Sequence, residues 1–305
     1  MPVPAVSVVM PAYNHARFIE ATINSVLGQS LDDLELVIVD DGSTDGTAEV
    51  IRGFSDPRIR YHYQENQDAF NALNRGISLA RGRHIAILNS DDLYTPTRLE
   101  RLLGECRAGA RFVFTDVEPI DDAGRSLADT AHPRNDWHRG NREFYLDGRD
   151  LYRGFLHGNY MVTTSNIFMT SELAGQVGPF APIRYLHDYD FVLRLLLAAE
   201  HETRYLDDER LLKYRIHSGN TLGEAAVIGR EQDREIIRKY LLARLPDDAR
   251  PYAEAGIDRL IALEHELLDV RRQLTRAAVP PPAPAPALLA RRLARRLRRA
   301  LGHGR

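Results

Sequence analysis

The chain has 305 residues, enough for one large domain or two modest ones. Its hydrophobic content of 44% and charged content of 27% are ordinary for a soluble globular protein, and a net charge of -3 gives no indication of nucleic-acid binding. The single cysteine, Cys106, excludes a disulfide framework within the chain. Because the start lacks a signal-peptide pattern and no run of about 18 apolar residues occurs, we expect a cytoplasmic protein that at most touches the inner face of a membrane.

Strand and helix patterns alternate over the first hundred residues. Apolar runs rich in β-branched residues predict buried strands at 6–10, 34–39, 59–63 and 85–88. Apolar residues at helical spacing predict helices through 18–27, 48–51, 70–80 and 95–103. We expect Ser43 or Thr44 to cap the second helix, and Pro96 to lie in the first turn of the fourth. This alternation predicts a mainly parallel, doubly wound α/β sheet.

The regular alternation ends after a fifth strand at 111–114. Residues 119–150 are polar and predict a loop-like flap near the site. Further strands at 165–169 and 205–216 and a helix over 187–199 are expected. The pattern from 223 to 276 is helical throughout, and a Pro/Ala-rich run at 279–287 predicts a stiff linker. Leucines and a valine recur at threes and fours from Leu260 to Leu274, which predicts a helix-pairing seam and allows a homodimer.

Three of the predicted strands end in residues suited to a ligand. The first ends in Pro11-Ala12-Tyr13-Asn14, the second in Asp40-Asp41, and the fourth in Asn89-Ser90-Asp91-Asp92. The carboxyl ends of neighbouring parallel strands share one edge, where open α/β sheets bind ligands. Adjacent carboxylates repel each other unless a cation lies nearby, and Mg²⁺ or Mn²⁺ suits carboxylate oxygens. Alternatively, the Asp-Gly-Ser segment is only a turn and helix cap.

Individual side chains at this edge suggest a nucleotide. The ring of Tyr13 can stack on a base. The carboxylate of Asp41 can accept a hydrogen bond from a base N–H or a ribose hydroxyl. A divalent cation held by the acids at 91–92 would in turn hold phosphates. We therefore expect chemistry on a nucleotide-activated substrate.

Three blocks of sequence together closely resemble the family 2 glycosyltransferases. They are residues 6–14, 39–45 and 74–92, and the similarity covers roughly residues 4–220. The resemblance implies a GT-A fold domain at 1–220, with a nucleotide-binding half at about 1–95 and an acceptor half at about 96–220. It further implies that Pro11, Ala12, Tyr13 and Asp41 hold base and ribose, that Asp92 binds the metal, and that Asp91 contacts ribose or metal-bound water. Ser90 stands where the family usually has its first acid.

The block His187-Asp188-Tyr189-Asp190, with Arg194 after it, is the second dense group of polar residues. Asp188 can be read as a helix cap. The block also resembles the family's Glu-Asp-Tyr-Asp motif, whose first Asp is the general base; that role falls on Asp188, and His187 replaces the usual Glu. A carboxylate that takes the acceptor proton opposite the departing diphosphate implies inversion at the sugar carbon. Asp190 and His187 are weaker candidates for acceptor or diphosphate contacts.

Other candidates carry less specific signals. The segment 214–220 resembles the family's closing segment, in which His217 would complete the metal shell or serve as a structural loop histidine, and Arg215 would touch the diphosphate. Asn166 lies where the family meets its acceptor. Trp137, the only tryptophan, could stack on a sugar face or pack structurally.

The last residues form a separate pattern. Residues 288–305 contain seven Arg and no acidic residue, and helical spacing separates the Leu from the Arg. This predicts a basic amphipathic helix suited to an anionic membrane surface. A disordered basic tail, or a helix for an acidic partner, remains the alternative.

Together these patterns predict a metal-dependent, inverting glycosyltransferase. The expected donor is a nucleotide sugar, with UDP favoured, and the expected acceptor is a glycan or a lipid-linked hydroxyl in cell-surface polysaccharide or glycoconjugate synthesis. A Gly-x-Gly-x-x-Gly fingerprint after the first strand is absent, as is a P-loop, which argues against a dehydrogenase or a P-loop enzyme. The alternative is a non-catalytic nucleotide-binding or scaffold protein whose C-terminal helix binds a membrane or partner.

Overall fold

The computed structural model describes residues 3–128, 130–131, 133–217 and 228–278; within these, it does not describe the side chains of 133–137, 228–231 and 275–278. The chain divides into two compact units, Met1–Arg244 and Leu245–Arg305. The predicted linker at 279–287 and the predicted basic helix at 288–305 lie outside the described residues.

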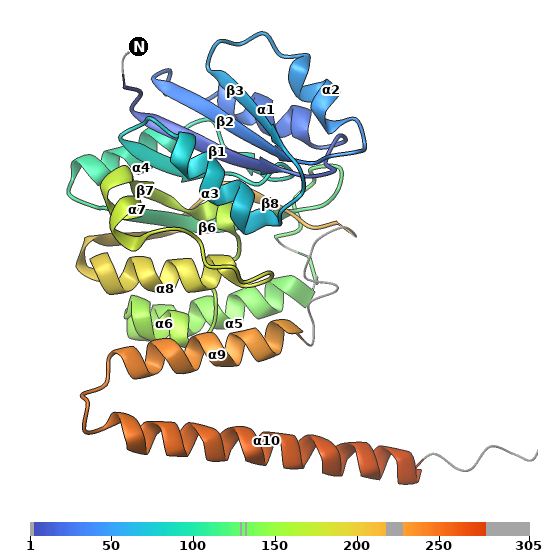
Figure 1. The fold of residues 1–305 in the computed structure, drawn as a ribbon, viewed down its shortest axis with the longest axis vertical. Coiled ribbons are helices and arrows are strands. Elements are labelled where there is room, and N and C mark those ends of the chain that lie inside the picture. Colours follow the sequence, from blue (N-terminus) through green and yellow to red (C-terminus); the bar gives the residue numbers. More distant parts are fainter. Residues whose placement is uncertain (1–2, 129, 132, 218–227, 279–305) are drawn as a thin grey trace, which may run out of the picture. The chain divides into compact units, whose positions relative to one another are not determined.

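The first unit contains an eight-stranded sheet (Figure 1). Its strands in chain order are β1 Val6–Ala12, β2 Leu34–Asp41, β3 Ile59–Gln64, β4 His84–Ile87, β5 Leu93–Tyr94, β6 Phe112–Ile120, β7 Phe168–Thr170 and β8 Thr203–Arg215. Their spatial order is β3-β2-β1-β4-β7-β6-β8-β5. Strands β3, β2, β1 and β4 are parallel, which confirms the predicted doubly wound start. Strand β7 runs antiparallel to both neighbours, so the second half of the sheet is mixed.

Helices connect the strands and cover the sheet (Figure 1). The α-helices are α1 Ile19–Leu27, α2 Thr47–Arg52, α3 Ala69–Leu79, α4 Arg98–Arg107, α5 Pro133–Gly148, α6 Leu151–His157, α7 Ser171–Val177, α8 His187–Ala199, α9 Ile228–Ala243 and α10 Arg250–Ala278. Two short 3-10 turns are η1 Thr164–Asn166 and η2 Glu200–Glu202. Among the described residues, none of these helices is both long and apolar enough to cross a membrane.

The core lies on both faces of the sheet. Strand β1 shows why: Val9 belongs to one buried apolar cluster, while Val8 and Met10 belong to the other. Successive side chains of a strand point to opposite faces, so a strand buried on both sides reads as a continuous apolar run. This is the pattern from which the sequence predicted the first strands. It places the strand ends, which carry the polar residues, at the rim of a rigid core.

Several boundaries differ from the sequence expectation. Helix α2 is preceded by Gly46 at φ 93° with no side-chain cap, so the expected cap from Ser43 or Thr44 is wrong. Instead, the Asp45 carboxylate accepts the N–H of Thr47. Helix α4 begins at Arg98, after Pro96 rather than around it.

The expected flap at 119–150 is mostly ordered secondary structure. Strand β6 continues to Ile120, and helix α5 occupies Pro133–Gly148. A hydrogen bond joins this helix to the sheet: Nε2 of His138 lies 2.8 Å from Oδ1 of the buried Asp116 on β6. The helical pattern expected over 223–276 corresponds to two helices in the described residues, α9 and α10, with a break between Ala243 and Arg250.

Candidate functional site

The ends of β1 and β2 are tied together by their loops. The Asn14 N–H donates to Ser43 Oγ, and Asn14 Oδ1 accepts the N–H of Thr44. Asn14 takes a left-handed backbone with φ 53°, which Asn tolerates better than most residues. The two residues expected to cap α2 therefore join the loops of neighbouring strands. The result is a fixed frame for the predicted base-binding residues.

Asp41 and Tyr13 differ in what they offer a ligand. Asp41 is 3% exposed, and its Oδ1 accepts from Gln64 Nε2 at 2.6 Å and from the Gln67 N–H at 3.0 Å. Tyr13 is 48% exposed at the end of the same sheet edge. Pro11 and Ala12 complete β1 beneath it. The aromatic face is thus accessible, whereas the carboxylate is anchored at the rim.

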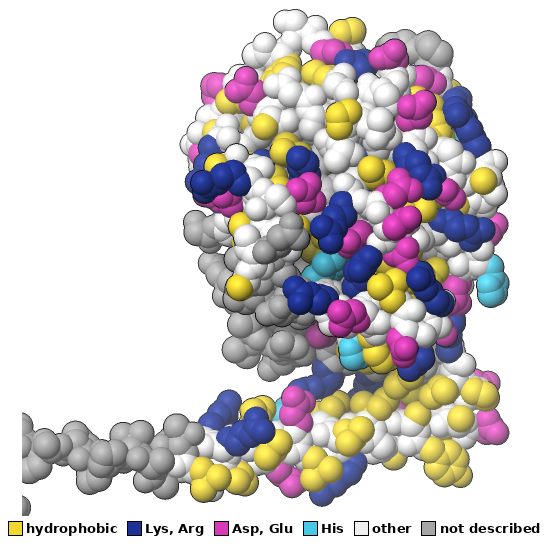
Figure 2. Space-filling view, turned by 180° about the vertical axis from the view of Figure 1, so that it is seen from behind, with side chains coloured by type: hydrophobic (Ala, Val, Ile, Leu, Met, Phe, Trp, Pro, Cys, Tyr) yellow, Lys and Arg dark blue, Asp and Glu magenta, His cyan; other side chains and the backbone are white. Residues whose placement is uncertain are grey.

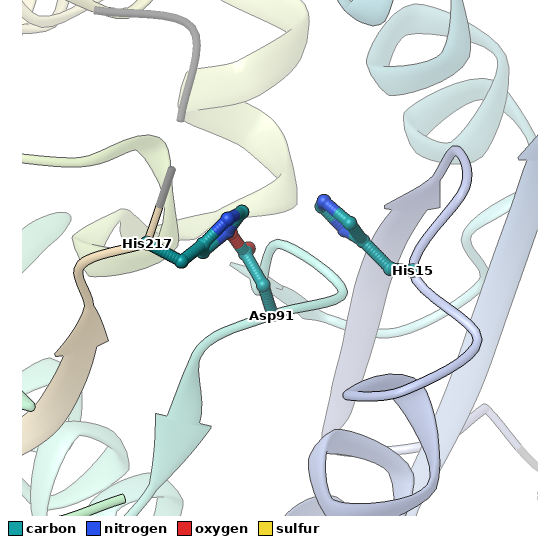
Figure 3. Close-up of side chains that lie close together, drawn as sticks. All are labelled: His15, Asp91 and His217. Carbon is teal, nitrogen blue, oxygen red and sulfur yellow. The ribbon is translucent and has the colours of Figure 1, made fainter. Parts of the chain in front are cut away.

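Three potential metal ligands lie together at this edge: His15, Asp91 and His217 (Figure 3). They come from the loop after β1, the loop after β4 and the end of β8. Each offers one ligand atom, and these atoms lie within 4.8 Å of one another. His217 Nε2 is 2.9 Å from Asp91 Oδ2, and His15 Nδ1 is 2.7 Å from Ser90 Oγ. Two imidazoles and a carboxylate form a mixed nitrogen and oxygen donor set.

The surroundings of these histidines are apolar as well as charged. The His217 side chain is 4% exposed and its ring lies 4.9 Å from the Phe18 ring. Burial lowers the pKa of His15. The charge of Asp91 acts to raise this pKa, and the nearby His217 acts to lower it further. A lowered pKa keeps the imidazole neutral at physiological pH, and neutral imidazole is the metal-binding form. Imidazole nitrogens with one carboxylate can bind a divalent transition-metal ion, whereas Mg²⁺ prefers oxygen ligands.

The second acid of the pair faces the interior. Asp92 is fully buried; its Oδ2 accepts from Ser165 Oγ at 2.5 Å and its Oδ1 accepts the Arg215 N–H at 2.9 Å. Burial, and then the charge of Asp91, raise the pKa of Asp92 well above its ordinary value. The group of three ligands contains Asp91 rather than Asp92. The metal-ligand role expected of Asp92 stays a prediction, and its geometry is that of a support for the loop.

Arg215 holds the same loop from the other side. Its Nε donates to the Asp91 carbonyl at 2.8 Å, and its Nη1 donates to the carbonyls of Asp121 and Asp122. The guanidinium also lies 4.8 Å from the Phe18 ring centroid. Because Arg215 is 4% exposed, these contacts make it an organiser of the acidic loop. The expected contact of Arg215 with a diphosphate stays a prediction.

Asp188 lies in the first turn of α8, not at the cap position, which belongs to Leu186. The Oδ1 atom of Asp188 accepts a hydrogen bond from the backbone N–H of Tyr189 at 2.8 Å, and its Oδ2 atom lies 3.5 Å from Asn159 Nδ2. Burial raises the pKa of Asp188, while the nearby His187 acts in the opposite direction. The His187 ring packs edge-on against Phe180, and its Nδ1 has no partner among the described residues.

One loop contacts both Asp92 and Asp188. In residues 159–166, Asn159 reaches Asp188, while Thr163 and Ser165 donate to Asp92. Between them Val162 has φ 77°, a conformation that a β-branched residue rarely adopts. Backbone of this kind persists only where the surroundings enforce it, and it clusters at functional sites. The loop therefore links the metal-ligand edge to the buried carboxylate of α8.

Two of the weaker candidates are buried and hydrogen-bonded within the protein, and their expected contacts with acceptor or diphosphate stay predictions. Asn166 is fully buried, where its Oδ1 accepts from Arg98 Nη2 and its Nδ2 donates to the carbonyl of Thr115. Asp190 is also fully buried and binds Tyr240 and Lys239 of α9. Trp137 lies in α5, but its side chain is outside the described residues.

Sequence reasoning missed His15 and did not connect Asn159 with Asp188. His15 follows Tyr13-Asn14 in the loop after the first strand. The rule that parallel strand ends share an edge could have placed it beside Asp91. No sequence signal pairs Asn159 with Asp188, since only the fold brings the loop to α8.

The chain is similar in sequence to known proteins. Residues 7–169 match the family described as glycosyl transferase family 2. An uncharacterized glycosyltransferase of Rickettsia typhi is 30% identical over 225 residues, which span 73% of this chain and 67% of that protein. The succinoglycan biosynthesis protein ExoO of Rhizobium meliloti is 40% identical over 127 residues, which span 41% of this chain and 36% of ExoO.

Two solved structures share the fold. S. aureus TarS residues 1–349, in complex with UDP-GlcNAc, aligns with a TM-score of 0.61 at 17% identity and covers 80% of this chain and 69% of that chain. The mannosyltransferase PcManGT from Pyrobaculum calidifontis, in complex with GDP-Man and Mn²⁺, aligns with a TM-score of 0.60 at 21% identity and covers 97% of this chain and 81% of that chain. The first unit thus has the GT-A fold.

Proposed function

The chain belongs to glycosyl transferase family 2, and from this premise we propose that it moves a sugar from a nucleotide diphosphate to an acceptor hydroxyl with inversion. The observation that carries the proposal is the loop 159–166, which contacts both Asp92, next to Asp91, and Asp188. Donor and acceptor chemistry need one site with a phosphate-binding side and a base side. The loop connects the proposed phosphate-binding side, through Asp92, with the proposed base side, through Asp188.

The donor side is the sheet edge. We assign Tyr13 to stack on the base and Asp41 to accept from base or ribose. His15, Asp91 and His217 would hold a divalent cation, which supplies neutralisation of charge on the departing diphosphate. Their mixed donor set favours Mn²⁺ over Mg²⁺. The fold neighbour TarS binds UDP-GlcNAc, which supports a UDP-sugar, whereas PcManGT binds GDP-Man.

The base side is α8. Asp188 would take the proton of the acceptor hydroxyl as it attacks the sugar carbon. A general base works best when its pKa lies near the operating pH, and burial moves the pKa of Asp188 upward in that direction. Asn159 would orient the carboxylate by donating to Oδ2. Attack opposite the leaving diphosphate inverts the configuration of the sugar carbon.

The acceptor is proposed to be a growing polysaccharide or another glycoconjugate. ExoO, named for succinoglycan biosynthesis, is 40% identical to this chain over 127 residues, and chondroitin synthase of Escherichia coli is 37% identical over 130 residues. A lipid-linked glycan would present the same kind of hydroxyl.

The direct test is a panel of nucleotide sugars with Mn²⁺, assayed for release of the nucleoside diphosphate and for the anomeric configuration of the product. We expect one UDP-sugar to give inverted product, and Asp188→Asn to lower turnover by about 10²–10⁴-fold with donor binding retained. Asp147→Asn, an exposed acid of α5, is the matched control and should turn over normally. Product of retained configuration, or normal turnover of Asp188→Asn, would overturn the proposal.

A further inference from the structure

Helix α10 carries an apolar stripe with the spacing of a coiled coil. Its apolar residues are separated by three and four residues in strict alternation: Leu260, Leu263, Leu267, Val270 and Leu274. Their exposed fractions run from 41% to 69%. Hydrophobic side chains are visible along the surface of this helix (Figure 2). Contiguous exposed apolar residues of this kind mark a surface that is covered by a partner.

The alternation fixes the heptad frame. A step of three leads from position a to position d, and a step of four leads from d to the next a. Leu260, Leu267 and Leu274 are therefore at a, while Leu263 and Val270 are at d. The stripe runs about 21 Å along the helix at 1.5 Å per residue. This frame also defines the flanking positions, e and g, that face a partner helix.

The flanking charges complement one another between two parallel copies. Position g of one heptad faces position e of the next heptad on the partner helix. Arg259 at g would face Glu264 at e, and Glu266 at g would face Arg271 at e. Both pairs join opposite charges, and symmetry creates each pair twice. Within one helix, Arg259 and Glu266 already form an exposed ion pair at 3.2 Å, so both side chains extend along the stripe.

We propose that α10 pairs in parallel with α10 of a second copy of this chain. The apolar stripe supplies the affinity, and the two g–e pairs set orientation and register. The second copy is favoured over an unrelated partner because the charges match themselves, which a surface for a different protein does not need. The pairing does not depend on the assignment of the catalytic residues.

The first test compares the mass of the full chain with that of two variants by sedimentation over a range of concentrations. Leu263→Asp places two carboxylates in one d layer and is expected to give a monomer. Leu268→Asp is the matched control: Leu268 is equally exposed, at 40%, but occupies position b outside the stripe. Helical content measured by circular dichroism should be the same in both variants. A wild-type chain that stays monomeric, or equal effects of the two substitutions, would refute the pairing.

The second test reads orientation. Glu264→Arg puts Arg against Arg259 of the other copy and should weaken self-association roughly tenfold. The double variant Arg259→Glu with Glu264→Arg restores opposite charges in parallel register and should recover the wild-type affinity. In an unrelated or antiparallel arrangement the second substitution restores nothing, and that result would overturn the proposal. Val270→Cys, treated with oxidised glutathione as the two-electron oxidant, should in addition form a disulfide between copies, because parallel d residues of one layer face each other.

Discussion

At the scale of single residues, the adjacent acids Asp91 and Asp92 make different contacts. Asp91 reaches the two histidines at the sheet edge, while Asp92 turns inward to Ser165 and the Arg215 backbone. One acid can hold a cation only if something else holds the loop, and Asp92 does that from a fully buried position. We therefore infer different roles for the two adjacent carboxylates: Asp91 would bind the cation, and Asp92 holds the loop in place.

The ionised carboxylate of Asp188 should favour transfer but lower the stability of the fold. Burial raises its pKa above the unfolded value, so its stabilising contribution is present below the ordinary Asp value near pH 4 and is lost as pH rises through the raised pKa. Asp188→Asn removes the cost of burying a charged carboxylate and should raise the melting temperature at pH 7 while lowering turnover. Calorimetry at pH 7 and pH 4 checks the sign: the gain should shrink at the lower pH. A lower melting temperature at pH 7 would contradict the burial argument.

The same raised pKa predicts the pH profile of transfer. Because the base must be ionised, kcat/KM should fall on the acidic side with a midpoint above the ordinary Asp value of about 3.9. The measurement is kcat/KM from pH 4 to pH 8 at saturating Mn²⁺. A rate that stays flat down to pH 4 would show that Asp188 does not act as the base.

His15 is expected to contribute to metal affinity. His15→Gln keeps a polar side chain of similar size but removes one imidazole from the group of three. We expect Mn²⁺ affinity in the presence of UDP to fall at least about tenfold, as for loss of groups that support metal sites. Titration calorimetry measures it, with the exposed His201→Gln as the control. Equal Mn²⁺ affinity of the two variants would remove His15 from the site.

At the scale of elements, helix α9 is attached to α8 by one buried carboxylate. Asp190 is fully buried; its Oδ1 accepts from Tyr240 and Lys239 of α9, and its Oδ2 accepts from Arg194. Burial alone would raise its pKa, but the hydrogen bonds from Tyr240 and Lys239, with the charge of Arg194, lower it. This residue stands two positions after Asp188, so the attachment also fixes the first turn of α8.

Loss of this attachment should cost stability. Asp190→Ala leaves the partners of a buried charge unpaired and should lower the free energy of unfolding by about 3 kcal/mol at pH 7. Because the folded pKa of Asp190 is lowered, the effect is present above the unfolded pKa and fades as pH falls through the folded value. Urea unfolding at pH 7 measures it.

The exposed pair of Asp269 and Arg272 supplies the control. Asp269→Ala removes a carboxylate that is 67% exposed, and its cost should stay below about 1 kcal/mol. Equal losses from Asp190→Ala and Asp269→Ala would show that the buried carboxylate does not hold α9.

The elements differ in how far the sequence predicts them. The first strands and α8 are predictable, because their apolar residues follow the periodicity of the buried faces. Helix α5 is not, because its residues are mostly polar and it is held by His138 against the buried Asp116. The break between α9 and α10 is likewise hidden, because both sides of it have helical periodicity.

The site shows a similar limit. Acids after apolar runs predict the sheet edge correctly, since strand ends meet there whatever the side chains do. Which of two neighbouring acids turns to the interior depends on the conformation of the loop: Asp92 bonds to Ser165 and the Arg215 backbone, and Asp91 lies beside His217. Asn166 and Asp190 are fully buried, which their polar side chains did not lead us to predict from the sequence.

At the scale of the whole molecule, every residue of the proposed site lies in the unit Met1–Arg244, and the proposed pairing lies in the unit Leu245–Arg305. A chain that ends at Arg244 should therefore unfold cooperatively and retain transfer to a small soluble acceptor within about twofold, since a unit with its own core folds alone. Differential scanning calorimetry and turnover measure this. A chain without a cooperative transition would show that the second unit is required for the fold.

The central claim is that a cation at His15, Asp91 and His217 and the carboxylate of Asp188 serve one sugar. A crystal structure of Asp188→Asn with the preferred nucleotide sugar and Mn²⁺, with the ion located by its anomalous scattering, tests it most directly. We predict an anomalous peak bonded to His15, Asp91 and His217 and touching the diphosphate, with the anomeric carbon facing the side chain at position 188. A peak elsewhere, or a sugar carbon turned away from that side chain, would contradict the account.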